Sequence, residues 1–510
     1  MKPILSCMLA VTLGVIAGSC SGRMRIVDTG VVAVGAHRAR LVHSANRVRK
    51  RISGGRIVLH VYDEEGRRIT WGRFRRMQEN GNGSEGDNDV LLDPASLQVI
   101  GMSPLEPDNG STTGDPSFIK PARATALAFA WPTTDGYSNI IVDLPASPGT
   151  YVYNVLAARQ LIHEVDEGIA VRRWYAPSTV LRSADRTAHE FLARANEART
   201  ESQQGAYAAR AMDAAVSSEV ILLAQSGLRY AAFHRSAEVK PQWAVTLDTI
   251  DGGIPVLNTI AALYSRDGWI RIVFDLGQPP QYYENEVRNA QRLGLHVVGE
   301  LLDSSDWASQ SYAQWQVRVR EYVSTLRTVD EWEVGNEANG DWLGPDVRQK
   351  IAYAAEYVKS HTRARTLLTL YWQLGDDDQP HEMFTWVHEN LNAAITSDID
   401  DVGMSIYPEE EPMGSAFDRV MTTLHKALPA QRLMITELDY WGYDGDHIWW
   451  WGSARDPYRA GRLAVANYYQ AAVYSYPYSG GGSFWWYYIE EVLPRGSTLW
   501  NALHELHAHL

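Results

Sequence analysis

Short apolar runs alternate with amphipathic stretches throughout the second half of the chain. In the amphipathic stretches, for example 282–293, 314–326 and 346–359, hydrophobic positions recur at helical spacing. The apolar runs predict eight strands, at 242–249, 269–276, 295–302, 331–337, 365–372, 399–407, 432–440 and 483–489. A doubly wound open sheet alternates in the same way, but no Gly-rich phosphate turn follows the first run. Eight units within residues 241–510 therefore predict an α/β fold with a C-terminal (β/α)8 TIM barrel, whose usual length is about 250 residues.

The first third of the chain has a different pattern. Between residues 24 and 180, short runs rich in Val, Ile, Leu and Tyr are separated by clusters of Gly, Pro, Asp and Asn. The runs at 56–62, 124–131, 139–144 and 150–155 predict strands, and no long helical pattern interrupts them. We therefore expect a β-sandwich-like domain over residues 24–180.

The stretch between these two regions is rich in Ala, Glu, Arg and Gln. Its apolar residues return at helical spacing, which predicts a helical connector over residues 186–230. Gln204 and Gly205 are expected to separate two helices within it, because glycine is unfavourable in a helix interior.

The first twenty residues have the pattern of a signal peptide. Lys2 precedes a short apolar stretch over residues 4–17, and small residues lead up to Cys20. The run 17–20, Ala-Gly-Ser-Cys, resembles a bacterial lipobox, although leucine is more usual where Ala17 stands. This resemblance implies an exported lipoprotein attached to the outer membrane or cell surface through a lipidated Cys20. Simple cleavage, which would give a secreted or periplasmic protein, is the alternative.

Composition narrows the function. A hydrophobic content of 45% and a charged content of 21% are typical of a folded globular chain. The net charge of −14, with no basic stripe, argues against a nucleic-acid partner and suits a neutral substrate better than an anionic polymer. Cys7 and Cys20 both lie in the leader, so the mature domains hold no disulfide, thiolate zinc site or cysteine nucleophile.

Two of the predicted strands end in a glutamate. Residues 332–338 read Trp-Glu-Val-Gly-Asn-Glu-Ala and place Glu337 at the end of the fourth strand, and residues 433–439 place Glu437 at the end of the seventh. The C-terminal ends of barrel strands carry the catalytic residues of this fold. Two carboxyl groups on separate strands are also what glycosidic bond cleavage requires, at about 5–5.5 Å in retaining enzymes. Two surface glutamates without a shared role are the alternative.

These segments resemble clan A of the glycoside hydrolases. Residues 332–338 and 435–439 are similar to the corresponding segments of family 10 xylanases, whereas 300–307 and 405–408 are more similar to family 53 galactanases. The His-rich ending of the third strand that is expected in family 10 is absent. The resemblance to the clan extends over residues 241–510, and the family within the clan stays open.

The resemblance implies a role for each matching residue. Glu337 would be the acid/base, Glu437 the nucleophile, and Asn336 the partner of the 2-hydroxyl of the reacting sugar. Glu337 would then need a setting that raises its pKa, so that its carboxyl group starts protonated.

Further residues complete the implied site. Arg271 would lie beside Glu437 and hold it ionised, and an arginine within an apolar strand independently demands a buried partner. Tyr407 would donate to Glu437. Trp486 fits best the place beneath the reacting sugar, and Trp485 is the alternative.

The loops after the predicted strands are rich in tryptophan. Trp307, Trp342, Trp441 and the triplet 449–451 are expected to stack on sugar rings, with contact to the N-terminal domain as the alternative. The acidic runs 376–378 and 409–411 are more typical of solvated rims than of metal ligands. No metal or cofactor is expected, because side chains supply the acid/base and the nucleophile.

The sequence therefore predicts a retaining glycoside hydrolase acting on a β-linked polysaccharide or oligosaccharide. One alternative is a non-catalytic glycan-binding lipoprotein on the same scaffold, for which an acid and a nucleophile would serve no purpose. Another is a transglycosylase, in which a sugar rather than water resolves the covalent intermediate. The product profile would distinguish hydrolysis from transglycosylation.

Overall fold

The computed structural model describes residues 54–81, 89–134, 136–233, 242–264, 268–375, 379–409, 411–440 and 457–509. The predicted signal segment with Cys20, the acidic run 376–378, Trp441 and the tryptophan triplet 449–451 lie outside these residues. None of the helices in the described part of the chain combines the length and apolar character that crossing a membrane requires.

The C-terminal part is a closed barrel of eight parallel strands, as predicted. The strands are β9 Gln242–Leu247, β10 Trp269–Val273, β11 His296–Glu300, β12 Glu331–Gly335, β13 Arg365–Tyr371, β14 Asp401–Ile406, β15 Arg432–Leu438 and β16 Ser479–Trp485. Each strand pairs with the next in sequence, and β16 pairs with β9 to close the barrel. Nearly every strand residue is buried, as expected for parallel strands that are covered by helices on one side and by each other on the other.

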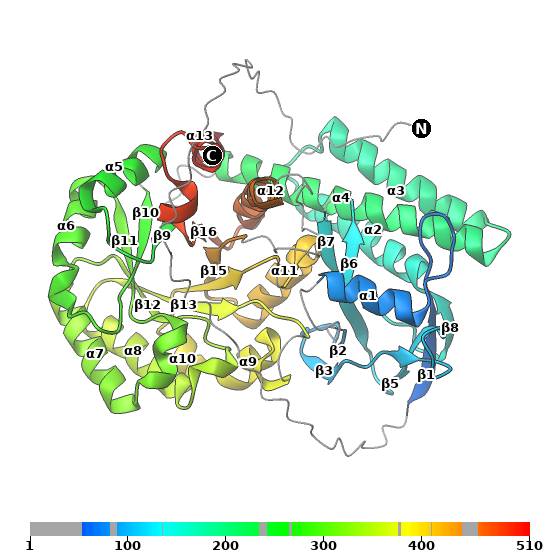
Figure 1. The fold of residues 1–510 in the computed structure, drawn as a ribbon, viewed down its shortest axis with the longest axis horizontal. Helices are drawn as coiled ribbons and strands as arrows, with labels where there is room; N and C mark the ends of the chain where they lie inside the picture. The colour runs from blue at the N-terminus through cyan, green and yellow to red at the C-terminus, as the bar shows by residue number, and fades with distance from the viewer. Residues whose placement is uncertain are drawn as a thin grey trace, which may run out of the picture. The chain divides into compact units, whose positions relative to one another are not determined.

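Helices follow the strands and cover the barrel from outside. They are α5 Gly253–Tyr264, α6 Glu284–Arg292, α7 Tyr312–Thr325, α8 Val347–His361, α9 Met383–Asn390, α10 Ala393–Thr396, α11 Phe417–Ala427, α12 Pro457–Ala472 and α13 Thr498–His509. Figure 1 shows α5, α6, α7 and α8 outside the strands β10 to β13. Short helical turns interrupt several strand-to-helix loops, among them η2 Ser304–Ser309, η4 Gln379–His381 and η5 Gly414–Ala416.

The last strand begins four residues earlier than the pattern predicts, at Ser479 rather than 483. The sequence there contains three consecutive glycines, which is typical of a turn. In the barrel they are strand residues: Gly481 and Gly482 have φ of +86° and +103°. A Cβ on Gly481 would lie 2.4 Å from the carbonyl oxygen of Gln242, and one on Gly482 would lie 2.1 Å from that of Ile435. Glycine is needed here because both neighbouring strands approach the backbone too closely for a side chain.

The N-terminal region contains two four-stranded sheets. One has the order β4-β5-β1-β8 and the other β3-β2-β6-β7. Their strands are β1 Gly55–His60, β2 Val90–Leu92, β3 Val99–Met102, β4 Glu106–Pro107, β5 Pro116–Lys120, β6 Ala126–Thr133, β7 Gly136–Asp143 and β8 Gly149–Val152. The expected sheets are therefore present, but two helices that the sequence did not predict lie among them, α1 Trp71–Gly81 and α2 Tyr153–Val171.

Helix α2 begins inside the run predicted as a strand over 150–155. Tyr153 and Val155 favour a strand by residue type. Tertiary contacts decide otherwise, because the side chain of Asn154 accepts from the backbone N–H of Tyr62 at 2.9 Å and donates to its carbonyl at 3.0 Å. Tyr153 is fully buried and packs against Phe129 of β6 with ring centroids 4.8 Å apart. The local preference is thus overridden by packing.

The connector is helical, but its break lies elsewhere than expected. Helix α3 is Thr179–Glu197 and α4 is Glu201–Phe233, so the break falls at residues 198–200 and Gly205 lies inside α4. A Cβ on Gly205 would lie 2.3 Å from the ring of Tyr62. This glycine therefore allows α4 to approach Tyr62, two residues after β1, and does not end a helix.

Candidate active site

Glu337 and Glu437 both lie at the C-terminal mouth of the barrel. Glu437 is the sixth residue of β15, and Glu337 follows β12 by two residues. The backbone of Glu337 has a φ of +46°, a conformation that non-glycine residues rarely adopt and that is concentrated at functional sites. Glu337 and Glu437 are only 8% and 3% exposed, so their charges are poorly screened by solvent.

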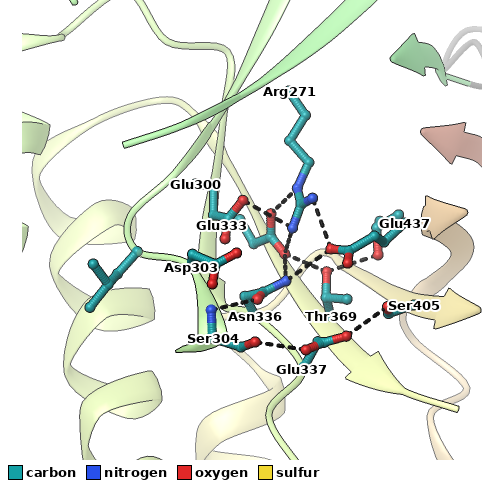
Figure 2. A network of polar contacts seen from close by, with 12 residues as sticks. Arg271, Glu300, Asp303, Ser304, Glu333, Asn336, Glu337, Thr369, Ser405 and Glu437 are labelled. Atoms are coloured by element: carbon teal, nitrogen blue, oxygen red, sulfur yellow. Dashed lines mark hydrogen bonds and ion pairs between the residues drawn. The ribbon is translucent and has the colours of Figure 1, made fainter. Parts of the chain in front are cut away.

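Arg271 of β10 is the centre of the polar network (Figure 2). Its guanidinium contacts Glu333 of β12 through Nε at 2.6 Å and Nη2 at 3.0 Å, and Glu437 through Nη1 at 3.0 Å. Nη2 also lies 3.1 Å from Glu300 at the end of β11. One fully buried cation thus faces three carboxyl groups, and this is the partner set that an arginine within an apolar strand requires.

Glu437 is surrounded by donors. Besides Arg271, it accepts from the hydroxyl of Tyr407 and, at 3.4 Å, from the amide of Asn336. Burial raises the pKa of Glu437, and the positive charge of Arg271 and the hydrogen bond from Tyr407 oppose that rise. Burial also raises the pKa of Tyr407 well above its usual range, so that its hydroxyl stays protonated and able to donate.

Glu337 has a different environment. Among the described residues, its two carboxyl oxygens accept from neutral hydroxyls, Ser304 at 2.7 Å and Ser405 at 2.8 Å. Burial, followed by the negative charge of Glu437, raises the pKa of Glu337 to about 8, against the effect of the two serines. Near neutral pH this carboxyl group is therefore mostly protonated. The pKa of Glu437 is also raised by burial, but Arg271 and Tyr407 act in the opposite direction and favour its anion. The arrangement can donate a proton from one side and present a carboxylate from the other.

Three polar residues around Arg271 and Asn336, namely Glu300, Glu333 and Thr369, were not predicted from the sequence, and neither were the serines that bind Glu337. Glu333 accepts from Thr369 of β13 at 2.6 Å in addition to Arg271, and it lies 3.4 Å from the amide of Asn336. Burial raises the pKa of Glu300 well above its usual range. A signal for the two acids was present, since Glu300 lies near the end of a predicted strand and Glu333 is a charged residue inside another. Nothing in the sequence points to Thr369.

The two tryptophans at the end of β16 take different places. The ring of Trp486 lies against Arg271, whose guanidinium carbon is 4.9 Å from the ring centroid. Trp485 is fully buried and donates its indole N–H to Glu491 at 2.9 Å. Of the two alternatives, only Trp486 borders the network around Glu437.

The loop tryptophans also differ from one another. Trp307 was expected to stack on sugar, but it is 1% exposed and packs on Trp315 of α7 with ring centroids 4.7 Å apart. That expectation is wrong, because the indole of Trp307 is directed into the protein, where its N–H donates to the carbonyl of Leu302. Trp342 is half-buried against Tyr371 and remains a candidate.

Two glutamates of the acidic run 409–411 are not on the solvated rim that was expected, and Glu410 lies outside the described residues. Glu409 and Glu411 are 5% and 2% exposed. Among the described residues, Asp166, Asp185 and His189 lie close enough together to bind a metal ion, with their ligand atoms within 4.8 Å of one another. This group belongs to α2 and α3, outside the barrel, and a ring nitrogen of His189 lies 3.2 Å from Asp166 and 3.6 Å from Asp185.

Comparisons with known proteins identify no family. No protein-family model and no curated protein matches the chain. Among solved structures, an endo-1,4-beta-xylanase of Penicillium canescens is 18% identical over 52% of this chain and 85% of its own, with a TM-score of 0.35. A psychrophilic family 10 endo-beta-1,4-xylanase is 13% identical over 52% and 96%, with a TM-score of 0.35.

Barrels of unrelated chemistry match to a similar degree. A mandelate racemase/muconate lactonizing enzyme-like protein from Rubrobacter xylanophilus is 11% identical over 78% of this chain and 85% of its own, with a TM-score of 0.29. All these scores are low, so the likenesses say nothing about the reaction. The barrel follows from the strand pairing itself, and any function must come from the site.

Proposed function

We propose that this chain is a retaining glycoside hydrolase that cleaves β-linked polysaccharides or oligosaccharides. The observation that carries the proposal is the unequal setting of Glu337 and Glu437, which lie on separate strands at the C-terminal mouth of one barrel. Glu337 accepts from two hydroxyls of the described residues and has a pKa of about 8, and Glu437 contacts Arg271 and Tyr407. Glycosidases of this type need one protonated and one ionised carboxyl group.

In the first step, the carboxylate of Glu437 attacks the anomeric carbon and forms an ester bond to the sugar. The glycosidic C–O bond breaks, and Glu337 gives its proton to the departing oxygen. In the second step, the carboxylate of Glu337 takes a proton from water, the water oxygen bonds to the anomeric carbon, and the ester to Glu437 breaks. Both side chains return to their starting protonation states, so no cofactor is consumed.

The contacts of the neighbouring residues support this assignment. Asn336 is fixed by the backbone N–H of Ser304, which donates to its Oδ1 at 2.8 Å, and its amide nitrogen faces Glu437. The same nitrogen is available to a hydroxyl of a sugar bonded to Glu437, a contact that strengthens in the transition state. Arg271 and Tyr407 stabilise the carboxylate of Glu437 both before attack and as a leaving group.

The test is a screen of the chain from residue 21 to 510 against β-linked polysaccharides and aryl β-glycosides. Glu337→Ala and Glu437→Ala are assayed in parallel, with Glu321→Ala, an exposed glutamate of α7, as the matched control. Loss of cleavage by several orders of magnitude in the two site variants, but not in the control, is the expected result. Wild-type rates in the Glu437 variant would show that Glu437 is not the nucleophile.

Two further measurements separate the mechanisms. NMR of the first-formed product tells retention from inversion of the anomeric carbon. Azide should restore activity to Glu337→Ala on aryl glycosides with good leaving groups, giving the β-glycosyl azide. It should not restore activity to Glu437→Ala by this route, because that variant lacks the nucleophile. Products longer than the substrate would favour the transglycosylase, and binding without cleavage across the panel would favour the glycan-binding protein.

A further inference from the structure

The edge strand of an N-terminal sheet contacts the loop that follows barrel strand β13. The backbone of Val99 in β3 makes two hydrogen bonds to this part of the barrel. Its N–H donates to the hydroxyl of Thr385 at 3.1 Å, and its carbonyl accepts from the side chain of Gln379 at 2.6 Å. Gln379 belongs to η4 and Thr385 to α9. Val99 pairs with Leu92 of β2 within the sheet, and two side chains of the barrel bind its backbone on the open edge, as a further strand would.

The same loop holds the turn that carries Glu337. The carbonyl of His381 in η4 accepts from the side chain of Asn339 at 2.9 Å, and a ring nitrogen of His381 lies 2.9 Å from the carbonyl of Asn339. Asn339 is fully buried and exchanges two more hydrogen bonds with the backbone of Tyr371 in β13. It follows Glu337 by two residues, so the sparsely populated backbone of Glu337 is fixed from this side.

A second contact joins the same sheet to the next loop of the barrel. The hydroxyl of Ser138 in β7 accepts from the backbone N–H of Ser415 at 3.2 Å. Gly414, the residue before Ser415, has a φ of +52°, and a Cβ on it would be 2.2 Å from the Ser138 hydroxyl. This loop begins at Tyr407, the donor to Glu437. Both partners of the sheet are therefore loops on the catalytic face of the barrel.

We propose that the edge strand β3 positions the proton-donating Glu337 by holding the loop after β13, with Thr385 and Gln379 as its positioning residues. The inference rests on the proposed function in that Glu337 is taken as the acid/base. The backbone of β3 contacts Gln379 and Thr385. His381, in the same short helical turn as Gln379, contacts Asn339 in the turn of Glu337. The N-terminal sheet is then part of the active-site scaffold and not only an appended domain.

The test compares a clamp variant, Thr385→Val combined with Gln379→Ala, with two controls. Thr385→Ser keeps the accepting hydroxyl. Ser475→Ala removes a buried hydroxyl that also links the N-terminal helices to the barrel, since Ser475 donates to the carbonyl of Leu223 in α4 at 2.5 Å. Ser475 precedes β16 and so lies at the opposite, N-terminal end of the barrel strands.

The first readout does not depend on activity. The titration midpoint of the Glu337 carboxyl group is measured by difference infrared spectroscopy against Glu337→Gln in each background. In the clamp variant the midpoint is expected to fall by about one pH unit, because a loosened turn admits water and moves Glu337 away from Glu437. Thr385→Ser and Ser475→Ala should keep the wild-type midpoint.

The second readout is the hydrolysis of two aryl β-glycosides. The clamp variant should lose about 10-fold in kcat on a phenyl glycoside, which needs a proton donor, and keep its rate on a dinitrophenyl glycoside, which does not. A wild-type midpoint in the clamp variant, or an equal shift in Ser475→Ala, would overturn the inference. If the wild-type chain cleaves no glycoside, the proposed function fails, while the infrared midpoint still decides whether β3 positions Glu337.

Discussion

Removing the two serine hydroxyls that face Glu337 should extend activity toward alkaline pH. Ser304 and Ser405 each donate to one oxygen of the carboxylate, at 2.7 and 2.8 Å. Both bonds favour the ionised form and therefore lower the pKa of Glu337, which burial and the charge of Glu437 still hold at about 8. The variants Ser304→Ala and Ser405→Ala thus remove stabilisation from the carboxylate, and the pKa of Glu337 should rise.

The size of the effect follows from the hydrogen bonds. A hydrogen bond to a charged group contributes about 1.5–3 kcal/mol, and one pKa unit corresponds to about 1.4 kcal/mol. Water that enters the space left by the hydroxyl recovers part of this loss. Each variant should therefore raise the pKa of Glu337 by about one unit, and the double variant by more than either alone.

The assay is kcat/KM on an aryl β-glycoside between about pH 5 and 10, since this ratio reports ionisations of the free enzyme. In the proposed mechanism Glu337 must be protonated to act, so its pKa would set the limb on which activity falls as pH rises. That limb should move upward by about one pH unit in each single variant. Ser324→Ala, which removes an exposed hydroxyl from α7, is the control and should leave it in place. A limb that stays fixed or moves to lower pH in Ser304→Ala and Ser405→Ala would refute the reasoning.

Three further changes have expected outcomes. Arg271→Lys keeps the charge but cannot bridge Glu333 and Glu437 at once, so kcat should fall about 100-fold and the acid limb of the pH profile should move upward. Tyr407→Phe removes a bond that lowers the pKa of Glu437, so the acid limb should rise by about one unit while the melting temperature is kept. Glu219→Gln should be more stable than wild type at pH 8 but not at pH 5, as thermal unfolding can show. Burial raises the pKa of Glu219 well above its usual range, so the folded state binds this proton more tightly and wild-type stability falls as pH rises above about 4.3. Equal pH dependence in both proteins would contradict this.

The barrel could be predicted because its signals are local. Each strand is buried on both sides and reads as an apolar run, and the helices between them are amphipathic. The errors occur where a distant contact decides the local structure. Gly205 looks like a helix break but serves the approach to Tyr62, and Tyr153 looks like a strand residue but begins a helix. Neither partner could be read from neighbouring residues.

The candidate site was predicted in part for a similar reason. Glu337 and Glu437 are marked by their position at strand ends, and Arg271 by its charge within an apolar strand. The serines that bind Glu337 come from positions 33 and 68 residues away, and which side chains meet there depends on strand register. Trp307 shows the opposite error, since its place in a loop says nothing about the direction in which η2 turns its ring.

A second buried charge cluster, at the other end of the strands, shows why the first one points to chemistry. Near the N-terminal ends of the barrel strands, Asp401 lies between Arg365 at 2.6 Å and Arg432 at 2.6 Å. Burial alone would raise the pKa of Asp401, but the hydrogen bonds and charges of the two arginines hold it below its usual value. Glu331 is the second acid of this cluster, and burial and the charge of Asp401 raise its pKa well above its usual range. Two arginines thus face two acids there, as expected of a cluster that only supports the fold.

At the C-terminal ends the acids outnumber the cation. Arg271 faces Glu300, Glu333 and Glu437, and the pKa of Glu300 and of nearby Glu337 is raised by burial. Excess buried carboxyl groups cost stability, because each must give up either its charge or its hydration. A barrel gains nothing for its fold from such an excess. A reaction that needs one carboxyl group protonated beside another that is ionised requires it.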